Sequence, residues 1–361
     1  MTAATRSRRF LIMAGGTGGH VFPALAVAEN LRQAGHEVEW LGTSRGLEAT
    51  VVPAAGFDLH CLAIGGLRGR GLVNLLKAPW AIGRAIWTTL GILRARRPQV
   101  VVGLGGYVTG PGGVAAKLMG IPLVIHEQNA VAGTTNRLLA RLSNRVLTAF
   151  PQVLPNAICI GNPVRTEIAA LAPPAVRLAR HERPFRLLVL GGSLGASALN
   201  QWLPKALAEM DEFDRPDVWH QAGKQHLEAA EIHYRERRIP ARIEPFIADM
   251  AAALGWADLV ICRAGALTVA ELCAAGVASI LVPYPFAIDD HQTANAQWLV
   301  QQQAAVLCPQ DTITASRLAD LIHQFCRDPQ RTLAMAEAAR AAAKPQATAT
   351  FTQHLLELAN G

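Results

Sequence analysis

The sequence predicts an α/β protein with two Rossmann-like domains, each built on a parallel sheet. Short apolar runs alternate with helical stretches along the whole chain, which is typical of parallel strands joined by helices. Two stretches, "LIMAGGTGGH" and "LVLGGSLGAS", repeat one pattern of apolar strand, glycine pair, short loop and helix. The length of 361 residues exceeds one ordinary core and suits two domains.

The first half of the chain contains candidate strands that are short and rich in apolar residues. They are expected at 10–14, 38–41, 59–64, 100–103, 123–126, 146–148 and 158–160. Helical stretches lie between them, and these are expected at 23–34, 72–95, 111–119 and 133–142. This order of elements predicts a first sheet that is covered by helices on both faces.

The pattern is interrupted after 161–165. A stretch rich in proline and charge follows at 166–185 and is expected to be a linker. The second half then begins with its own strand and glycine loop. Further strands are expected at 218–221, 242–246, 259–262 and 279–282, and the last helices at 333–343 and 350–359. We therefore expect domains at 1–163 and 164–342, followed by a helical tail at 343–361.

The composition indicates a folded protein with reduced thiols. Hydrophobic residues make up 51% of the chain and charged residues 17%, which excludes a disordered protein. The six cysteines are scattered, which argues for a cytosolic protein and against a structural zinc site. The first apolar run is too short for a signal peptide, so none is expected. No run reaches the roughly 18 apolar residues of a membrane span.

The positive charge is concentrated in the first half of the chain. The net charge is +7, but residues 1–165 contain 17 Lys and Arg against 6 Asp and Glu, a net +11. The rest contains 17 against 21, a net −4. This asymmetry indicates an anionic partner for the first half, such as a nucleic acid, a membrane surface or a phosphorylated substrate.

The two glycine loops suit an anion or a closely approached sugar. A glycine turn from a strand into a helix exposes backbone N–H groups at the helix N-terminus, where the helix dipole favours negative charge. Neither loop matches Gly-x-Gly-x-x-Gly or ends in the Gly-Lys-Ser/Thr of a P-loop, so NAD and ATP are not indicated. The alternative is that the glycines only allow tight packing of strand against helix.

His20 follows the first glycine loop. Ligands of such folds bind beyond the carboxyl ends of the strands, so His20 is expected to face the ligand. A histidine at this place can act as a general base near neutral pH. A structural or merely exposed histidine is the alternative.

A second informative stretch covers residues 259–298. A strand ends at Arg263, and the N–H groups of the helix that begins near Ala266 are a suitable seat for a pyrophosphate. Glu271 lies about one turn into this helix, where it could accept both hydroxyls of a ribose or only favour the helix dipole. The polar cluster at 289–295 suits a loop that reads a sugar, and its adjacent acids make a weak metal site.

Six motifs together indicate a family. They are, in chain order, "GGTGGHVFPALAVA", "HEQNAVAGTTNR", "GNPVR", "GGSLGA", "RAGALTVAEL" and "PYPFAIDDHQTANA". The chain resembles the bacterial family 28 glycosyltransferases that add N-acetylglucosamine (GlcNAc) from UDP-GlcNAc to lipid I, giving lipid II for peptidoglycan. The resemblance implies a GT-B fold, in which two domains face each other across a cleft. It also implies an acceptor-binding first domain, a donor-binding second domain, and a last helix that returns to the first domain.

The resemblance implies site residues in both halves. In the first half, Thr17, Gly18 and Gly19 would lie beside the sugar and diphosphate of the donor. Asn129 would contact the transferred GlcNAc from the acceptor side.

In the second half, Arg165 would lie against the nucleotide and Ser193 would bond a phosphate. Ile247 would read the uracil through its backbone, and Gln292 would bind GlcNAc hydroxyls. The phosphates and the ribose would be held by Ala266, Leu267, Thr268, Val269, Ala270 and Glu271. Leu194 stands where the family commonly has glutamine, so a polar contact from that side chain is not expected.

The family's chemistry is a direct displacement at the anomeric carbon with inversion. The 4-hydroxyl of the N-acetylmuramic acid (MurNAc) of lipid I must lose its proton, and the charge on the departing UDP must be stabilised. His20 is the first candidate for the base. Glu127 and His126 are the other candidates, and His126 equally suits a buried structural role. No metal and no cofactor is implied.

The stretch 67–98 combines apolar side chains and tryptophan with basic residues and contains no acid. Its basic residues are Arg68, Arg70, Lys77, Arg84, Arg94, Arg96 and Arg97. Such a helix suits a peripheral hold on an anionic membrane, here the cytoplasmic face of the bacterial plasma (inner) membrane. The alternative is that the apolar residues cover the sheet. A nucleic-acid partner is disfavoured because no known binding module accompanies the charge, and protein partners are not indicated.

Three rival functions share some of these features. A UDP-GlcNAc 2-epimerase has the same architecture and nucleotide, but it has no use for a basic membrane segment. Another GT-B lipid glycosyltransferase, such as one acting on diacylglycerol, would differ in its acceptor, and the "HEQN" stretch argues against it. A binding protein without catalysis would not require a glycine loop in both halves.

Overall fold

The computed structural model describes residues 7–65, 72–179, 184–192 and 195–360. The chain forms two compact units. Unit 1 comprises Met1–Val164 together with Gln346–Gly361, and unit 2 comprises Arg165–Pro345. The C-terminal residues therefore belong to the same unit as the N-terminal ones.

Unit 1 is built on a seven-stranded sheet in the order β3-β2-β1-β4-β5-β6-β7, in which every pair is parallel. Its strands are β1 (Arg9–Ala14), β2 (Glu37–Gly42), β3 (Asp58–Cys61), β4 (Val100–Gly105), β5 (Leu123–Glu127), β6 (Arg145–Thr148) and β7 (Ile158–Cys159). Its helices are α1 (Gly18–Gln33), α2 (Glu48–Ala54), α3 (Leu72–Arg96), α4 (Thr109–Leu118), α5 (Thr134–Leu139) and α15 (Ala347–Asn360).

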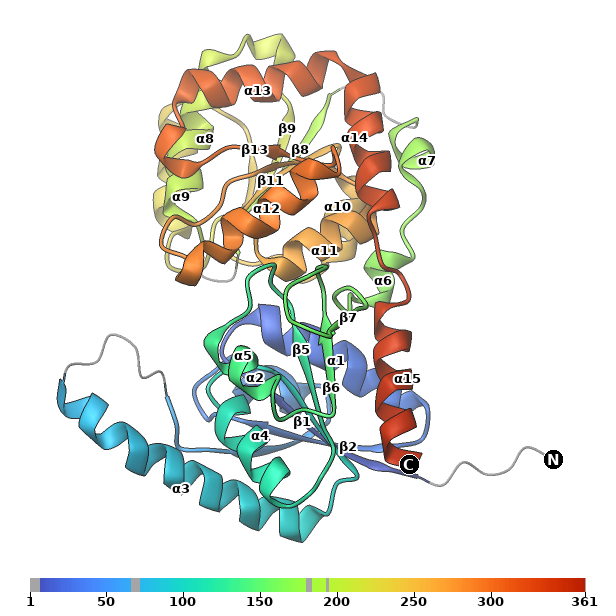
Figure 1. The fold of residues 1–361 in the computed structure, drawn as a ribbon. Coiled ribbons are helices and arrows are strands. Elements are labelled where there is room, and N and C mark those ends of the chain that lie inside the picture. The colour runs from blue at the N-terminus through green and yellow to red at the C-terminus, as the bar shows by residue number, and fades with distance from the viewer. Residues whose placement is uncertain (1–6, 66–71, 180–183, 193–194, 361) are drawn as a thin grey trace. The chain divides into compact units, whose positions relative to one another are not determined.

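Successive side chains of a strand point to opposite faces of the sheet. Both faces are apolar here, because the strands are apolar at successive positions. Phe10 and Ile12 of β1 belong to the core under α1, α2 and α15, whereas Leu11 and Met13 belong to the core under α3, α4 and α5. Figure 1 shows α1 and α15 on one side of the sheet and α3 and α4 on the other. Unit 1 is thus a three-layer α/β sandwich.

Unit 2 has a six-stranded parallel sheet in the order β10-β9-β8-β11-β12-β13. Its strands are β8 (Arg186–Leu190), β9 (Asp217–Gln221), β10 (Arg242–Glu244), β11 (Leu259–Cys262), β12 (Ala278–Leu281) and β13 (Val306–Leu307). Its α-helices are α6 (Thr166–Ala169), α7 (Pro174–Leu178), α8 (Ser197–Glu209), α9 (Leu227–Glu236), α10 (Met250–Trp256), α11 (Ala266–Ala275), α12 (His291–Gln301), α13 (Ala315–Arg327) and α14 (Pro329–Ala341). The prediction of two Rossmann-like α/β domains is confirmed.

Both sheets have the same point of reversal in their strand order. In unit 1 the chain runs outward in one direction from β1 and in the other from β4, and in unit 2 it does so from β8 and β11. In open parallel sheets, ligands bind beyond the carboxyl ends of the two strands that flank such a point. The two glycine loops follow β1 and β8, so the fold places each of them at a reversal point.

Three local expectations need correction. The stretch 166–185 is not only a linker, because α6 and α7 form within it and pack on unit 2. Arg177 of α7 is buried and donates hydrogen bonds to the carbonyls of Ala275 and Gly276, which anchors this segment. Helix α1 begins five residues earlier than expected and includes Pro23, which removes only one bond of the helical ladder. The short helix α2 was not expected at all.

Candidate functional site

The loops after β1 and β4 meet at the reversal point of unit 1. A Cβ on Gly106 would lie 2.5 Å from the carbonyl oxygen of Gly15, so only glycine allows the two backbones to come this close. Gly16 has a φ of 93°, which other residues rarely adopt. The sequence "GGTGGH" therefore serves both a turn and a backbone contact.

The N-terminus of α1 follows directly. Thr17 is the N-cap, but its side chain accepts no capping hydrogen bond, and its carbonyl accepts from His20 N at 3.1 Å. The N–H groups of Gly18 and Gly19 have no partner within the helix. These two N–H groups and the helix dipole can together bind an anion.

The buried carboxylate of Glu48, in α2, holds this loop in place. Its Oε2 accepts from Gly16 N at 2.9 Å, and its Oε1 accepts from Thr43 N at 2.9 Å and from Thr43 Oγ1 at 2.7 Å. A Cβ on Gly15 or Gly46 would overlap this carboxylate. The sequence analysis did not single out Glu48. The local sequence around Glu48, "GTSRGLEAT", shows only one acidic residue in a stretch with two glycines and several small residues.

His20 lies in the first turn of α1, not in the loop before it. Its ring rests against Gly105, where a Cβ would lie 2.6 Å from Nδ1. Nδ1 is 3.0 Å from Oε1 of Gln128. The ring is partly exposed, so His20 is within reach of a ligand at the reversal point.

His126 and Glu127 are the last two residues of β5, so their side chains point to opposite faces of the sheet, and Gln128 and Asn129 follow the strand. His126 is fully buried against Phe351 of α15, with ring centroids 5.2 Å apart, and its Nε2 donates to the carbonyl of Gly161 at 2.9 Å. Burial lowers the pKa of His126 to about 4. His126 is therefore a neutral residue inside the fold. This agrees with the structural role that was one of the two expectations for it.

Glu127 points to the opposite face and is also buried. Its Oε1 accepts from the backbone and side-chain nitrogens of Asn129 at 3.0 and 3.2 Å. Its Oε2 accepts from Gly133 N at 3.1 Å and from Asn136 Nδ2 at 2.9 Å. This geometry suits a residue that shapes the loop and orients Asn129, rather than one that takes a proton from substrate.

In unit 2, the loops after β8 and β11 flank the second reversal point. Gly192 and Gly195 both have a φ near 80°, and Ser193 and Leu194 lie outside the described residues. Helix α11 begins after Gly265 with no capping side chain. Its first turn is the part that can present N–H groups to a phosphate.

The expected contacts along α11 are not all equivalent. Ala266, Leu267 and Thr268 form the first turn, where backbone N–H groups point out of the helix. The N–H of Val269 instead donates to Gly265 O at 2.9 Å, and Ala270 follows it inside the helix. A ligand at this end would therefore meet the first three residues before it met the next two.

Arg165 and Glu271, two expected nucleotide contacts, lie side by side. Nε and Nη2 of Arg165 both donate to Oε1 of Glu271, at 3.1 and 2.6 Å. Burial raises the pKa of Glu271, and the neighbouring Arg165 opposes that shift. The pair places one guanidinium and one carboxylate near the middle of α11.

The remaining expected residues of unit 2 lie in the segment after β10 and in α12. Ile247 is buried, with 2% of its surface exposed. Gln292, in α12, accepts from Tyr284 N at 2.9 Å, and Asn295 donates to the carbonyl of Ala264 at 3.1 Å. Asp289 and Asp290 each have a φ near 50°, an uncommon conformation that often marks functional loops.

Within the parts of the chain that the structure describes, no group of three or more His, Cys, Asp or Glu could hold a metal ion. Each unit gathers its own set of expected residues. Thr17, Gly18, Gly19, His20 and Asn129 lie around the reversal point of unit 1. Arg165, Glu271 and the start of α11 lie around that of unit 2.

The sequence matches two family profiles that together cover most of the chain. Residues 10–148 match the glycosyltransferase family 28 N-terminal domain, and residues 186–351 match the glycosyltransferase family 28 C-terminal domain. The first match covers most of unit 1 and the second lies mainly in unit 2.

Two full-length relatives carry the name UDP-N-acetylglucosamine--N-acetylmuramyl-(pentapeptide) pyrophosphoryl-undecaprenol N-acetylglucosamine transferase. The protein from Marinobacter nauticus is 55% identical over 364 residues and covers 100% of both chains. The protein from Alkalilimnicola ehrlichii is 57% identical over 349 residues, which is 96% of this chain and 98% of that one.

Solved structures agree with this similarity. The crystal structure of Acinetobacter baumannii MurG superposes with a TM-score of 0.84 at 42% identity, covering 97% of this chain and 99% of that one. The glycotransferase of kitacinnamycin superposes with a TM-score of 0.69 at 19% identity over 98% of this chain and 100% of that chain, a likeness of fold alone.

Proposed function

The chain belongs to glycosyltransferase family 28, and on that premise we propose that it transfers GlcNAc from UDP-GlcNAc to lipid I, forming lipid II. The observation that carries the proposal is the 55% identity over the full length of a relative that bears this activity in its name. The acceptor atom is the 4-hydroxyl of the MurNAc of undecaprenyl-pyrophosphoryl-MurNAc-pentapeptide.

The donor is assigned to unit 2. The first turn of α11 can bind the diphosphate through its N–H groups, and Arg165 adds a positive charge beside it. Glu271 can accept hydroxyl hydrogens of the ribose, Ile247 can contact the uracil through its backbone, and Gln292 can contact the sugar. Ser193 is proposed to bond a phosphate from the second glycine loop.

The acceptor and the base are assigned to unit 1. His20 takes the proton of the 4-hydroxyl while the oxygen attacks the anomeric carbon of GlcNAc. The bond from that carbon to the β-phosphate oxygen breaks, UDP leaves with the electron pair, and the configuration inverts. Gly18 and Gly19 at the start of α1 can stabilise the negative charge that develops, and Asn129, oriented by Glu127, can contact the transferred sugar.

Helix α3 is proposed to hold the enzyme at the cytoplasmic face of the plasma membrane. Trp80 and Trp87 are 70% and 73% exposed, and Arg84 and Arg94 are exposed on the same helix. Spacings of 4, 3 and 7 residues place all four on one stripe, while Ala85 and Leu93 face the core. We refer to these four residues as the α3 stripe.

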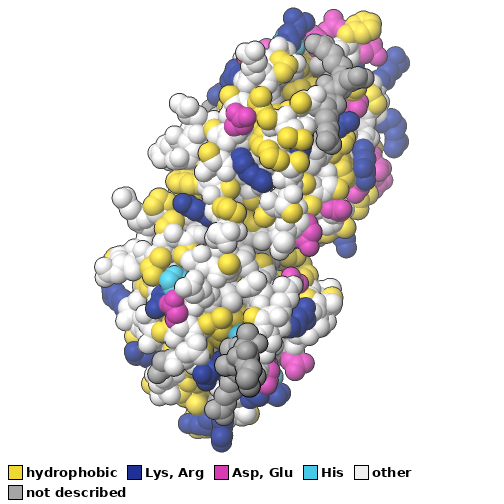
Figure 2. Space-filling view, turned by 90° about the vertical axis from the view of Figure 1, so that its right-hand side faces the viewer, with side chains coloured by type: hydrophobic (Ala, Val, Ile, Leu, Met, Phe, Trp, Pro, Cys, Tyr) yellow, Lys and Arg dark blue, Asp and Glu magenta, His cyan; other side chains and the backbone are white. Residues whose placement is uncertain are grey.

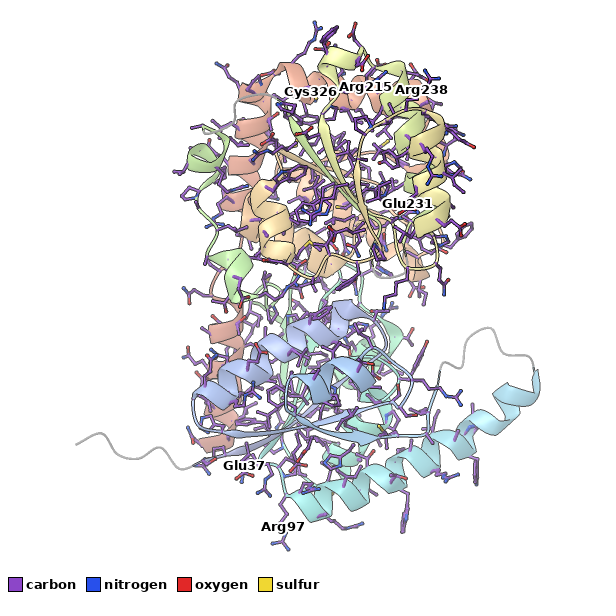
Figure 3. All side chains as sticks on the ribbon, turned by 180° about the vertical axis from the view of Figure 1, so that it is seen from behind. Glu37, Arg97, Arg215, Glu231, Arg238 and Cys326 are labelled. Atoms are coloured by element: carbon purple, nitrogen blue, oxygen red, sulfur yellow. The ribbon has the colours of Figure 1, made fainter. Side chains whose placement is uncertain are left out.

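The surroundings support an interfacial role for the α3 stripe. Arg97, just past the end of α3, points away from unit 1 (Figure 3). The face of unit 1 that carries α15 instead mixes acidic and basic side chains (Figure 2). Within the described residues, no helix has the length and apolar character needed to span a bilayer. An anionic lipid surface would attract the arginines and accommodate the tryptophans.

A transfer assay tests the proposed function. The purified protein is incubated with radiolabelled UDP-GlcNAc, with and without a lipid I analogue, beside a His20→Gln variant. Label that enters the lipid only when the acceptor is present supports the proposal, and the variant should bind UDP-GlcNAc yet transfer at least about 100-fold more slowly. Conversion of UDP-GlcNAc to its 2-epimer without acceptor would contradict the proposal.

A further inference from the structure

A continuous row of polar groups joins a backbone carbonyl to His20. Nε2 of His126 lies 2.9 Å from Gly161 O. Nδ1 of His126 lies 3.2 Å from Nε2 of Gln128, and Oε1 of Gln128 lies 3.0 Å from Nδ1 of His20. All four groups belong to unit 1.

The buried end of the row fixes the proton on His126. A carbonyl oxygen can only accept a hydrogen bond, so Nε2 of His126 must carry a hydrogen. The ring is neutral at pH values well above its lowered pKa of about 4. Nδ1 of His126 therefore presents a lone pair to Gln128.

That lone pair fixes the orientation of the Gln128 amide. The amide nitrogen lies 3.2 Å from Nδ1 of His126 and 3.2 Å from the carbonyl oxygen of His126, and both of these atoms are acceptors. The opposite orientation would place the amide oxygen against two acceptors. Oε1 of Gln128 must therefore face His20.

We propose that Gln128 is a positioning residue that holds His20 in the Nδ1–H tautomer, so that the lone pair of its Nε2 is available as the base. The tautomer of His20 is inferred from the hydrogen bonds alone, and only its use as a base rests on the proposed function. Within the described part of the chain, no hydrogen bond reaches Nε2 of His20.

Three further contacts hold the row in place. Asn162 Nδ2 donates to the backbone carbonyl of Gln128 at 3.2 Å, and Asn136 Nδ2 donates to that of His126 at 3.3 Å. Phe351 of α15 packs on the ring of His126. An imidazole in water favours the Nε2–H form, which would present a hydrogen to the acceptor hydroxyl and could not act as a base. A fixed partner for Nδ1 removes that form.

The tautomer can be measured without any assay of activity. The full-length protein is labelled with ¹⁵N-histidine, and long-range proton–nitrogen correlation spectra distinguish a protonated Nδ1 from a protonated Nε2. His20→Gln identifies the His20 signal by its disappearance. We expect His20 of the wild-type protein to carry its hydrogen on Nδ1 at neutral pH.

Two substitutions of Gln128 separate positioning from packing. Gln128→Met keeps the volume but removes the acceptor, so the His20 signal should shift to the Nε2–H form and kcat should fall on the order of 100-fold. KM for UDP-GlcNAc should stay within about two-fold, since the donor is assigned to other groups. Gln128→Glu keeps an acceptor for Nδ1, so His20 should keep its hydrogen on Nδ1 in this variant. Its second carboxylate oxygen would face the two acceptors of His126, so the variant should also be less stable than the wild-type protein.

A control perturbs the same strand away from the row. Asn144 Oδ1 accepts from Leu123 N at the first residue of β5, so Asn144→Ala weakens β5 without touching His20. It should lower stability but leave the tautomer of His20 and the kcat unchanged. An Nε2–H signal in the wild-type protein, or an unchanged tautomer in Gln128→Met, would overturn the inference. A Nδ1–H signal in a protein that transfers no GlcNAc would instead overturn the proposed function.

Discussion

Gly105 lies directly against the imidazole of His20, in a backbone conformation with a φ of 124°. A methyl group there would come within 2.6 Å of Nδ1 and would also strain the backbone. We predict that Gly105→Ala displaces the ring from Gln128 and lowers kcat by on the order of 100-fold. The unfolding free energy should fall by about 1–3 kcal/mol, measured by urea denaturation.

Gly91 provides the matched control. It lies on an exposed part of α3, with no atom within 4 Å of an added Cβ. Gly91→Ala should leave kcat unchanged and stabilise the helix by about 0.5–1 kcal/mol. Equal effects of the two substitutions on kcat would show that Gly105 has no particular relation to His20.

Single residues show where sequence reasoning succeeds and where it stops. Thr17, Gly18 and Gly19 could be singled out because a glycine turn before a helix is a local pattern. Glu48 could not, because its partner Gly16 is 32 positions away and the contact exists only once β1 and β2 are paired. The role of Gln128, the residue after β5, also depends on its contacts with His126 and His20, and the contact with His20 spans 108 positions of the chain.

For whole elements, helix α3 shows the same limit of prediction from sequence. The sequence predicted the helix almost to its ends, but it could not divide the apolar residues between core and surface. The structure makes that division, since Leu90 and Leu93 pack into the core of unit 1 while Trp80 and Trp87 remain exposed. Helix boundaries follow local pattern, whereas the buried face depends on the neighbouring helix α4.

The α3 stripe leads to a prediction for membrane binding. Replacing both Trp80 and Trp87 with alanine should lower the partition constant onto vesicles containing anionic lipid by on the order of 100-fold. Raising the salt concentration should weaken binding of the wild-type protein as well, because the arginines act by long-range attraction. Vesicle sedimentation measures both effects.

Phe213 of unit 2 gives a matched control. It is an aromatic side chain that is 93% exposed, and it lies among acidic residues. Phe213→Ala should leave vesicle binding unchanged. Undiminished binding by the double tryptophan variant would assign membrane contact to a different surface.

At the scale of the whole molecule, two buried histidines predict a loss of stability in acid. Burial lowers the pKa of His126 to about 4 and that of His220 to about 3. Between the ordinary histidine pKa of about 6.5 and these values, the unfolded chain takes up protons that the folded chain does not. The contribution of these two histidines to the free energy of unfolding is therefore fully present above about pH 6.5. Below that pH, each of them should lower the free energy of unfolding by about 1.4 kcal/mol per pH unit, until its folded-state pKa is reached.

Urea unfolding at about pH 7 and about pH 5 measures this loss. His220 is hydrogen-bonded to Tyr234 inside unit 2, so His220→Asn offers a polar replacement that does not titrate. The variant should lose less stability between the two pH values than the wild-type protein. The same loss in both proteins would mean that His220 is already protonated in the folded state.

The division of the chain into two units could be predicted from local pattern only in part. Alternating strands and helices predicted two parallel sheets, because this pattern is a property of each segment. The placement of the last helix on unit 1 is a long-range packing result, in which Phe351 and Leu355 complete the core under α1. The apolar residues of α15 indicate only that this helix must be covered, and its return to the first domain was expected from the family resemblance alone.

This arrangement means that unit 1 needs both ends of the chain. Burial of Phe351 and Leu355 stabilises the fold by about 1.5–3 kcal/mol each, against a typical domain stability of about 5–15 kcal/mol. Arg145 adds an ion pair with Glu357 at 2.6 Å. We therefore predict that a fragment ending at Val164 is poorly folded, whereas the fragment Arg165–Pro345 unfolds cooperatively by itself. Circular dichroism with thermal unfolding measures both.

A synthetic peptide of residues 346–361 should restore the first fragment. Because the peptide supplies the missing face of the core, the mixture should gain helical signal and show a cooperative transition whose midpoint rises with peptide concentration. The same peptide with Phe351→Ala and Leu355→Ala should fail to do so. A fragment 1–164 that is stable without any peptide would show that α15 covers a core that is already complete.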